Sequence, residues 1–196
     1  MFFLNTSSSQ EIRIGTQIWS KVNLNVTTFR NGDPIPEGYQ NSGWDDAGKH
    51  KKPVWSYYQN TPANGKKYGK LYNWYAVNDP RGLAPKGWHI PSVSEWETLI
   101  KYLGGKTAAC LKLRSKYGWD GDYNGNNSSG FNGLPAGLVY PFGTSIGLGT
   151  QGAWWCTTEL SITEAWGFYV LGRDDCTVEK SIHEKNYGIS VRCIKD

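Results

Sequence analysis

One stretch, residues 85–105, limits the structures that this chain can adopt more than any other. Ser92 and Glu95 have the Ser-x-x-Glu spacing of a capping box, which predicts that a helix begins directly after Ser92. The pair Gly104 and Gly105 ends this helix, because glycine tolerates the left-handed backbone of a helix terminus. Five apolar side chains between these ends share one helix face: Val93, Trp96, Leu99, Ile100 and Leu103. We therefore expect an amphipathic helix that packs against a core.

The N-terminal half is predicted to contain a β-hairpin, a further strand and a second helix. Alternating apolar residues predict the hairpin over 11–19 and the further strand over 22–29. Residues 35–66 are rich in Pro, Gly, Asn and Lys, which is typical of a long loop, with a short strand expected near 54–58. The second helix is predicted over 68–77, with its apolar side chains facing inward.

The C-terminal half is predicted to be β structure, after a second long loop over 114–133. Five short strands are expected between turn residues: 138–140, 153–158, 165–171, 176–182 and 189–194. Trp154 and Trp155 are expected to pack in the core, and Glu159 is expected to accept hydrogen bonds from a loop backbone.

The composition excludes some classes of function. A net charge of +4 is too small for a dedicated nucleic-acid binder, and the basic run at 49–52 is interpreted as a solvated loop. No apolar segment approaches the roughly 18 residues of a membrane-spanning helix. Ten Trp, twelve Tyr and six Phe supply large buried areas to a chain with only 38% hydrophobic residues. Aromatic side chains beyond those that the core needs are candidates for a binding surface.

The chain is expected to hold one domain over 11–196, after a disordered or tag-like segment over 1–10. Residues 1–4 are too short for a signal peptide and lack a basic start. Either the sequence begins after a removed export signal, or the protein is not exported by that route.

Several short motifs occur in an order typical of one protein family. Gly-Trp-His-Ile-Pro at 87–91 precedes Glu-Trp at 95–96. Further motifs are Gly-Thr-Gln-Ile-Trp at 15–19, Leu-Tyr-Asn-Trp-Tyr-Ala-Val at 71–77, Gly-Phe at 130–131, Leu-Pro-Ala-Gly at 134–137, Trp-Trp-x-Thr-Thr-Glu at 154–159 and Tyr-Gly-Ile-Ser-Val-Arg-Cys at 187–193. Over nearly its whole length the chain resembles the Fibrobacter succinogenes major paralogous domain, a family abundant in Bacteroidetes.

The resemblance implies a C-type-lectin-like fold, related to that of the formylglycine-generating enzymes. In such a fold the last strand returns to pair with the first, which assigns 189–194 to the hairpin strands of 12–19. We therefore expect an α+β domain with two helices, small antiparallel sheets, long loops, and paired N- and C-terminal strands.

Four cysteines, Cys110, Cys156, Cys176 and Cys193, allow three pairings and show no Cys-x-x-Cys spacing typical of a zinc or thioredoxin-type site. The family commonly pairs a cysteine before its Pro-x-Gly-Trp-His motif with the one in Val-Arg-Cys. Ala84 takes the first of these positions here, so Cys193 needs another partner, for which Cys110 is the candidate. The family resemblance implies an oxidising compartment.

No catalytic residues are predicted, because His50, His89 and His183 do not pair with Cys or Asp at a motif spacing. His89 is expected to be a buried structural histidine. The formylglycine-generating enzymes bind a metal through two active-site cysteines, for which this chain has no convincing counterpart. The Glu-Pro-Asn, Gln-Pro-Asp and Trp-Asn-Asp tripeptides of calcium-dependent lectins are also absent from the sequence.

One loop resembles the start of a calcium-binding EF-hand, because Asp120, Asp122, Asn124 and Asn126 alternate. The twelfth position, however, is Phe131 instead of the bidentate glutamate. A turn-rich loop is therefore the preferred interpretation and calcium the alternative, and we predict neither a metal nor a cofactor.

The candidate ligand-binding residues come from a comparison with related lectin-like proteins, the variable targets of diversity-generating retroelements. Such elements mutate adenines, which converts Asn codons to a limited set of other codons. Cys156 and Cys176 are natural products of that scrambling and awkward for a structural disulfide. The nine candidates are Cys156, Leu160, Ser161, Gly167, Tyr169, Leu171, Arg173, Asp174 and Cys176. The alternative is ordinary sequence drift on exposed strands.

The predicted function is that of a non-catalytic recognition module, secreted or exposed on a cell or virion surface. It would bind a protein or glycan through the face built by residues 156–186, without nucleic-acid partners or a membrane span. Three alternatives stay open: a retroelement-diversified receptor-binding protein of a phage or bacterial surface, a metal-dependent oxidase-like enzyme, and a structural envelope module.

Overall fold

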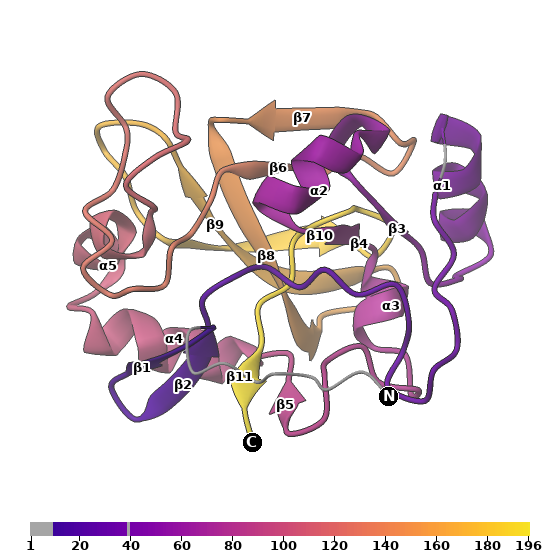
Figure 1. Cartoon of the computed structure of the whole chain (residues 1–196), viewed down its shortest axis with the longest axis horizontal. Helices are drawn as coiled ribbons and strands as arrows, with labels where there is room; N and C mark the ends of the chain where they lie inside the picture. Colours follow the sequence, from indigo (N-terminus) through magenta and orange to yellow (C-terminus); the bar gives the residue numbers. More distant parts are fainter. Residues whose placement is uncertain (1–9, 39) are drawn as a thin grey trace.

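The computed structural model of the protein describes residues 10–38 and 40–196 (Figure 1). The predicted N-terminal segment 1–10 therefore lies outside the described residues, except for its last residue. The helices are α1 Gln40–Lys49, η1 Tyr58–Asn60 (a 3₁₀ helix), α2 Pro62–Tyr68, α3 Trp74–Val77, α4 Val93–Tyr102 and α5 Lys106–Leu113. The strands are β1 Glu11–Ile14, β2 Gln17–Ser20, β3 Trp55–Ser56, β4 Leu71–Tyr72, β5 Trp88–His89, β6 Ala136–Val139, β7 Ser145–Leu148, β8 Gln151–Glu159, β9 Glu164–Leu171, β10 Glu179–Glu184 and β11 Ile194–Lys195.

A three-stranded antiparallel sheet, in the order β10-β9-β8, separates two apolar clusters. Successive side chains of a strand point to opposite faces, so β8 and β9 each contribute to both clusters. Trp154 and Phe168 lie directly opposite each other on β8 and β9 and join the cluster that contains α4. Their neighbour Trp155 joins the other cluster, which contains α3 and β4. Both faces of β8 and β9 are therefore covered by the rest of the chain, whereas one face of β10 is exposed.

The helix α4 begins and ends where the sequence predicts. The Ser92 hydroxyl accepts a hydrogen bond from the Glu95 N–H, and the Glu95 carboxylate accepts one from the Ser92 N–H at 2.7 Å. Trp96 is fully buried, and its ring lies 5.0–5.8 Å from those of four other aromatic residues: Trp19, Phe131, Trp154 and Phe168. The predicted apolar face of α4 thus forms the centre of the first cluster, which confirms that prediction.

The two ends of the described chain meet in a second sheet, in the order β1-β2-β11-β5. Ile194 of β11 lies opposite Trp19 on one side and His89 on the other. The predicted N-terminal hairpin and its pairing with the last strand are therefore confirmed. The segment before β11 runs beside other elements, because Ile189 bridges Tyr72 and Ser190 bridges Trp154.

Several predicted elements in the N-terminal half are wrong. Residues 22–29 form no strand, because their backbone bonds go to scattered partners, such as Leu24 N–H to the Val191 carbonyl at 2.8 Å. The predicted helix over 68–77 is instead β4 followed by the four-residue α3. Asn73 makes this break, since its side chain accepts hydrogen bonds from the N–H groups of Ala76 and Val54.

The number of helices is also larger than predicted: the described residues contain five α-helices instead of two. The predicted loop 35–66 holds α1, η1 and α2 as well as the expected short strand, and α5 and β7 were missed. Tertiary contacts explain α1, where the Trp44 indole is buried and donates a hydrogen bond to the Asn186 carbonyl at 2.8 Å. The last predicted strands are shifted, since β10 covers 179–184 and β11 only 194–195.

The structure also corrects the cysteine pairing. Cys110 and Cys176 form a disulfide with their Cα atoms 5.9 Å apart, while Cys156 and Cys193 are buried free thiols. The prediction that Cys110 pairs with Cys193 is therefore wrong. The interpretation of Cys176 as a stray residue is wrong as well, because it links the β9–β10 loop to α5.

Replacing Cys110 and Cys176 together by serine is expected to lower the free energy of unfolding by about 2–4 kcal/mol, because the cross-link closes a 66-residue separation. Chemical denaturation measures this change, and peptide mapping without reductant identifies the bonded pair. The control Cys156→Ala should leave that cross-link intact. A disulfide that contains Cys193 would contradict the prediction.

Candidate functional site

The structure does not bring the nine predicted ligand-binding residues together. Cys156, Gly167 and Cys176 are buried, so these three cannot contact a ligand on the surface. Cys156 faces the first apolar cluster, Gly167 is covered within the sheet, and Cys176 forms the disulfide. The other six are exposed or half-buried: Leu160, Ser161, Tyr169, Leu171, Arg173 and Asp174.

These six residues lie at opposite ends of β9. Leu160 and Ser161 belong to the turn between β8 and β9, whereas Arg173 and Asp174 belong to the loop after β9. Eight residues of extended strand separate these ends by about 23 Å at about 3.3 Å per residue. The predicted face therefore splits into two regions, and we follow the one that carries the larger exposed apolar side chains.

The β8–β9 turn is held by Lys185, a lysine whose side chain is almost completely buried. Its ammonium group binds the Glu159 carboxylate and donates to the Ile162 carbonyl at 3.0 Å. It also lies 4.6 Å from the centre of the Trp74 ring. Glu159 thus accepts a lysine side chain and not the loop backbone, which corrects the prediction for this residue.

The segment 185–188 connects the β8–β9 turn to the β6–β7 hairpin. Lys185 N–H donates to the Thr163 carbonyl at 2.9 Å, and two residues later the Tyr187 ring packs edge-on against Tyr140 at 5.4 Å. The Gly188 and Val139 backbones then exchange two hydrogen bonds of 2.8 Å. Tyr140 opens the hairpin turn, which lies near α1 in Figure 1.

We define the apolar turn surface as the side chains Tyr140, Phe142, Leu160, Ile162 and Tyr187. Four of these are exposed, and Tyr187 is half-buried. Phe142 is 71% exposed and Ile162 is 74% exposed, the two highest values among the large apolar side chains that the structure describes. Only Leu160 is among the nine predicted residues, so sequence analysis missed Tyr140, Phe142, Ile162 and Tyr187. The one available signal was an aromatic residue in a Pro-Phe-Gly turn at 141–143.

Behind this surface lies His183, whose imidazole stands between the rings of Trp155 and Tyr187 at 5.7 and 5.4 Å. Burial lowers the pKa of His183 to about 4, so the ring is neutral near pH 7. Ser181 is within hydrogen-bond distance at 2.7 Å. This histidine therefore extends an aromatic stack from the core towards the surface.

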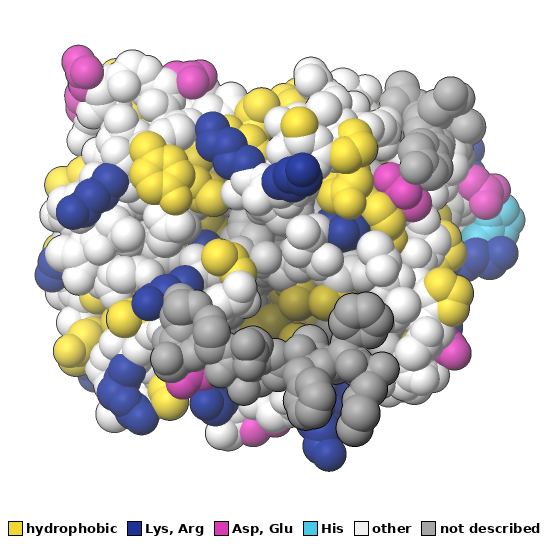
Figure 2. All heavy atoms as spheres, viewed as in Figure 1, with side chains coloured by type: hydrophobic (Ala, Val, Ile, Leu, Met, Phe, Trp, Pro, Cys, Tyr) yellow, Lys and Arg dark blue, Asp and Glu magenta, His cyan; other side chains and the backbone are white. Residues whose placement is uncertain are grey.

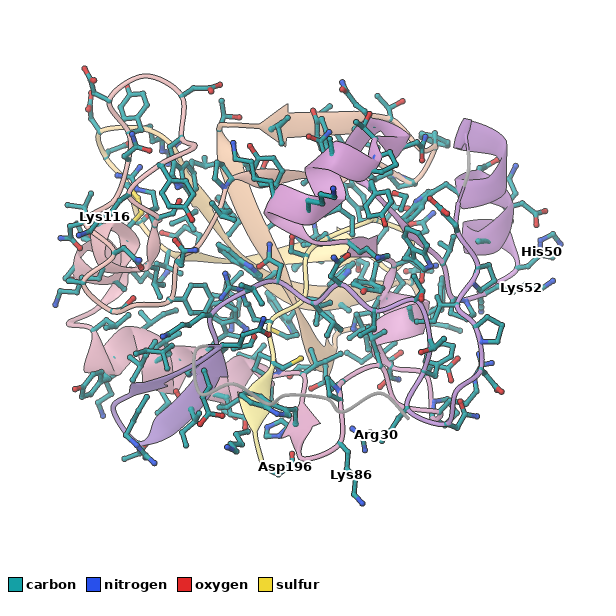
Figure 3. The ribbon with its side chains drawn as sticks, in the orientation of Figure 1. Arg30, His50, Lys52, Lys86, Lys116 and Asp196 are labelled. Carbon is teal, nitrogen blue, oxygen red and sulfur yellow. A yellow bond between two sulfur atoms is a disulfide. The ribbon has the colours of Figure 1, made fainter. Side chains whose placement is uncertain are left out.

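His89 is half-exposed, not buried as predicted, and both of its ring nitrogens meet carboxylates. Nδ1 is 2.7 Å from Asp196 and Nε2 is 2.8 Å from Glu95, the residue that caps α4. Burial alone would lower the pKa of His89, but hydrogen bonds and charge from the two carboxylates outweigh it, so the pKa is raised. Figure 3 labels Asp196 at the lower edge, next to Lys86. His89 thus connects the capping box of α4 to the end of β11.

The free thiols are poorly suited to chemistry. Burial raises the pKa of Cys193 to about 12 and also raises that of Cys156 well above the ordinary value. The thiolate is the reactive form of cysteine, so both groups stay protonated near pH 7.

The loop that resembles an EF-hand uses two of its candidate ligands for its own structure. Asn124 accepts a hydrogen bond from the Trp119 N–H at 3.2 Å, and Asn126 accepts one from the Ser128 N–H at 2.9 Å. Over residues 10–38 and 40–196, no three side chains of His, Cys, Asp or Glu gather closely enough to hold a metal ion. In the same residues, no helix is both long and apolar enough to cross a bilayer.

Comparison with known proteins gives one match. A family model described as the Fibrobacter succinogenes major domain matches residues 12–195 of the chain. No curated protein and no solved structure matches it significantly.

The His89 cluster predicts a pH-dependent stability. A histidine whose pKa is raised on folding stabilises the folded protein below its unfolded pKa of about 6.5, and this contribution is lost as the pH rises through the folded value. Between pH 6.5 and 9 the free energy of unfolding of the wild type should therefore fall by up to about 1 kcal/mol relative to that of His89→Gln. The change is small because solvent screens the partly exposed pairs. Urea denaturation at several pH values measures this difference. A difference that stays constant over this range would show that the two carboxylates do not hold a charged imidazole.

Proposed function

The chain belongs to the Fibrobacter succinogenes major domain family, and from this premise we propose that it is a non-catalytic recognition module that binds a protein ligand through the apolar turn surface. The observation that carries this proposal is the exposure of Phe142 and Ile162 on two turns that are both bonded to the segment 185–188. Single apolar side chains are normal on a protein surface, but a group of them around two turns is typical of an interaction site.

The two turns are held by hydrogen bonds to the segment 185–188. The Lys185 ammonium fixes the β8–β9 turn through Glu159 and the Ile162 carbonyl. The backbone bonds between Val139 and Gly188 fix the hairpin beside it. A surface already held in place loses less conformational entropy on binding, which favours affinity.

The chemical character of the surface favours a protein over a glycan. Leu160 and Ile162 are aliphatic, and Phe142 carries no polar group, so these three side chains offer apolar contact and no hydrogen bonds. Such side chains act as anchors that enter apolar pockets of a protein partner. A glycan would need more polar groups within this surface.

The absence of catalysis is part of the proposal and is supported by the reactive groups of the chain. An oxidase-like enzyme of the formylglycine-generating type would need two accessible thiols. Cys110 and Cys176 are bonded to each other, and the thiols of Cys156 and Cys193 are buried with raised pKa values.

The location and fold type are proposed on the same basis. A disulfide is typical of an oxidising compartment, which supports an extracellular or cell-surface location. We also propose that the fold is C-type-lectin-like, which is supported by the pairing of β11 with β2.

The double variant Phe142→Ala with Ile162→Ala is expected to weaken ligand binding at least tenfold, a change of about 1.4 kcal/mol, because it removes both anchors. The assay captures partners from bacterial and host surface extracts with immobilised protein, identifies them, and measures their affinity by biolayer interferometry. The matched control is Tyr117→Ala with Leu111→Ala, which removes an exposed aromatic and an exposed aliphatic side chain elsewhere.

Equal loss in both double variants, or no loss in the first, would rule out the apolar turn surface as the binding site. Failure to capture any partner would favour the structural envelope module. Circular dichroism of each variant establishes that the fold is retained.

A further inference from the structure

A groove runs between the β1–β2 hairpin, α4 and α5, and shares no residue with the apolar turn surface. It consists of two adjoining hollows with volumes of about 560 and 430 Å³, both of which include Ile14 and Tyr102 in their walls. In Figure 1 these elements lie together at the lower left, where the hairpin runs beside α4. The groove is therefore a separate feature of the surface.

Tyr102, the last residue of α4, forms an exposed aromatic platform in this groove. Its side chain is 64% exposed, although its ring lies against the hairpin turn. A β-carbon placed on Gly15 would come within 2.9 Å of two Tyr102 ring carbons, and Gly15 also has a φ of +62°. Only glycine allows the turn to approach the ring this closely. The hairpin thus restricts the ring while most of it remains in solvent.

The charge of the groove has one sign. Arg13, Lys101 and Lys112 contribute to its walls, whereas no Asp or Glu does. In the part of the chain that the structure describes, none of the three has a carboxylate within 4.0 Å, in contrast to Lys106, which pairs with Glu179 at 2.7 Å. Figure 2 shows basic side chains spread over the side of the molecule where α5 and the hairpin lie.

Hydroxyl groups complete the groove. Thr16, Thr98, Ser128 and Ser129 line its walls. The Ser129 hydroxyl donates to the Lys112 carbonyl and accepts from the Phe131 N–H, and the Thr98 hydroxyl donates to the Ser94 carbonyl, which leaves the hydroxyl groups of Thr16 and Ser128 for a ligand. The Lys112 ammonium group donates one hydrogen bond to the Leu103 carbonyl at 2.9 Å, which positions the group and leaves two further N–H donors for a ligand. The groove therefore offers an aromatic ring, three cations and two hydroxyl groups.

We propose that this groove binds an acidic saccharide, with one sugar ring on Tyr102 and carboxylate or sulfate groups facing the three cations. The aromatic face carries a negative quadrupole that suits the polarised C–H groups of a sugar ring. The cations supply charge complementarity and the hydroxyl groups match those of the sugar. A single-stranded nucleic acid fits less well, because successive bases stack on several aromatic side chains and this groove exposes one.

Isothermal titration calorimetry at low salt tests the proposal with four probes: a galacturonate tetrasaccharide, a heparin hexasaccharide, neutral maltohexaose and oligo(dT). Binding is expected for at least one acidic saccharide, and comparison of the first two distinguishes carboxylate from sulfate. Tyr102→Ala should weaken it about two- to tenfold, and Lys101→Gln up to about fivefold. The controls Tyr117→Ala and Lys86→Gln remove an exposed tyrosine and an exposed lysine outside the groove and should bind like the wild type.

The proposal is overturned if neither acidic saccharide binds, or if maltohexaose binds as tightly as they do. Equal binding of oligo(dT) would assign the groove to polyanions in general, and unchanged affinity of Tyr102→Ala would remove the ring from the site. Because Phe142 and Ile162 lie outside the groove, each of these outcomes is independent of the proposed protein ligand.

Discussion

Arg192 is buried, and none of the carboxylates that the structure describes lies within 4.0 Å of its guanidinium, so the packing of the segments around it depends on how its charge is satisfied. Its guanidinium donates to the side chain of Asn23 and to the backbone carbonyls of Ser20, Phe131 and Asn132 at 2.7–2.9 Å. Burial lowers its pKa to about 9, which still leaves it charged near neutral pH. A buried charge must be compensated, so the segments that supply these oxygen atoms are held together at one point. Asn23 extends this network by accepting from the Trp154 indole at 2.9 Å.

The need to compensate buried charges also explains the positions of several aromatic residues. Lys70 is buried over the rings of Trp55 and Tyr57, at 4.5 and 4.8 Å, and receives its other support from Asn25. Eight of the ten tryptophans are buried, so the expectation of spare aromatics for binding holds for only a few tyrosines and phenylalanines. Aromatic rings that stabilise buried cations contribute to the core as well as to electrostatics. The two most exposed aromatic rings of the described residues, Phe142 and Tyr102, belong to the two proposed surfaces.

Local sequence patterns predicted the elements whose causes are local. The capping box of Ser92 and the spacing of apolar residues place α4 correctly, and alternation places the first hairpin and β9. Local patterns did not predict the elements that long-range contacts stabilise. One example is α1, where the Trp44 indole donates to a carbonyl 142 residues later in the chain. The prediction of the candidate site failed because it, too, depends on long-range contacts. A list of nine positions in one segment did not reveal that β9 would separate them or that Tyr140 would join the Tyr187 ring.

We expect the Arg192 network to make the molecule one cooperative unit, which keeps both proposed surfaces in place. Native-state hydrogen exchange tests this claim most directly, through the N–H groups of Ser20, Leu24 and Trp155, which bond to carbonyls of the C-terminal segment at 2.8–3.1 Å. These three amides are expected to exchange only by global unfolding, with the same free energy as the amides of the β8–β9 ladder. Exchange of the three at a clearly lower free energy than that ladder would contradict it, because the C-terminal segment would then open on its own.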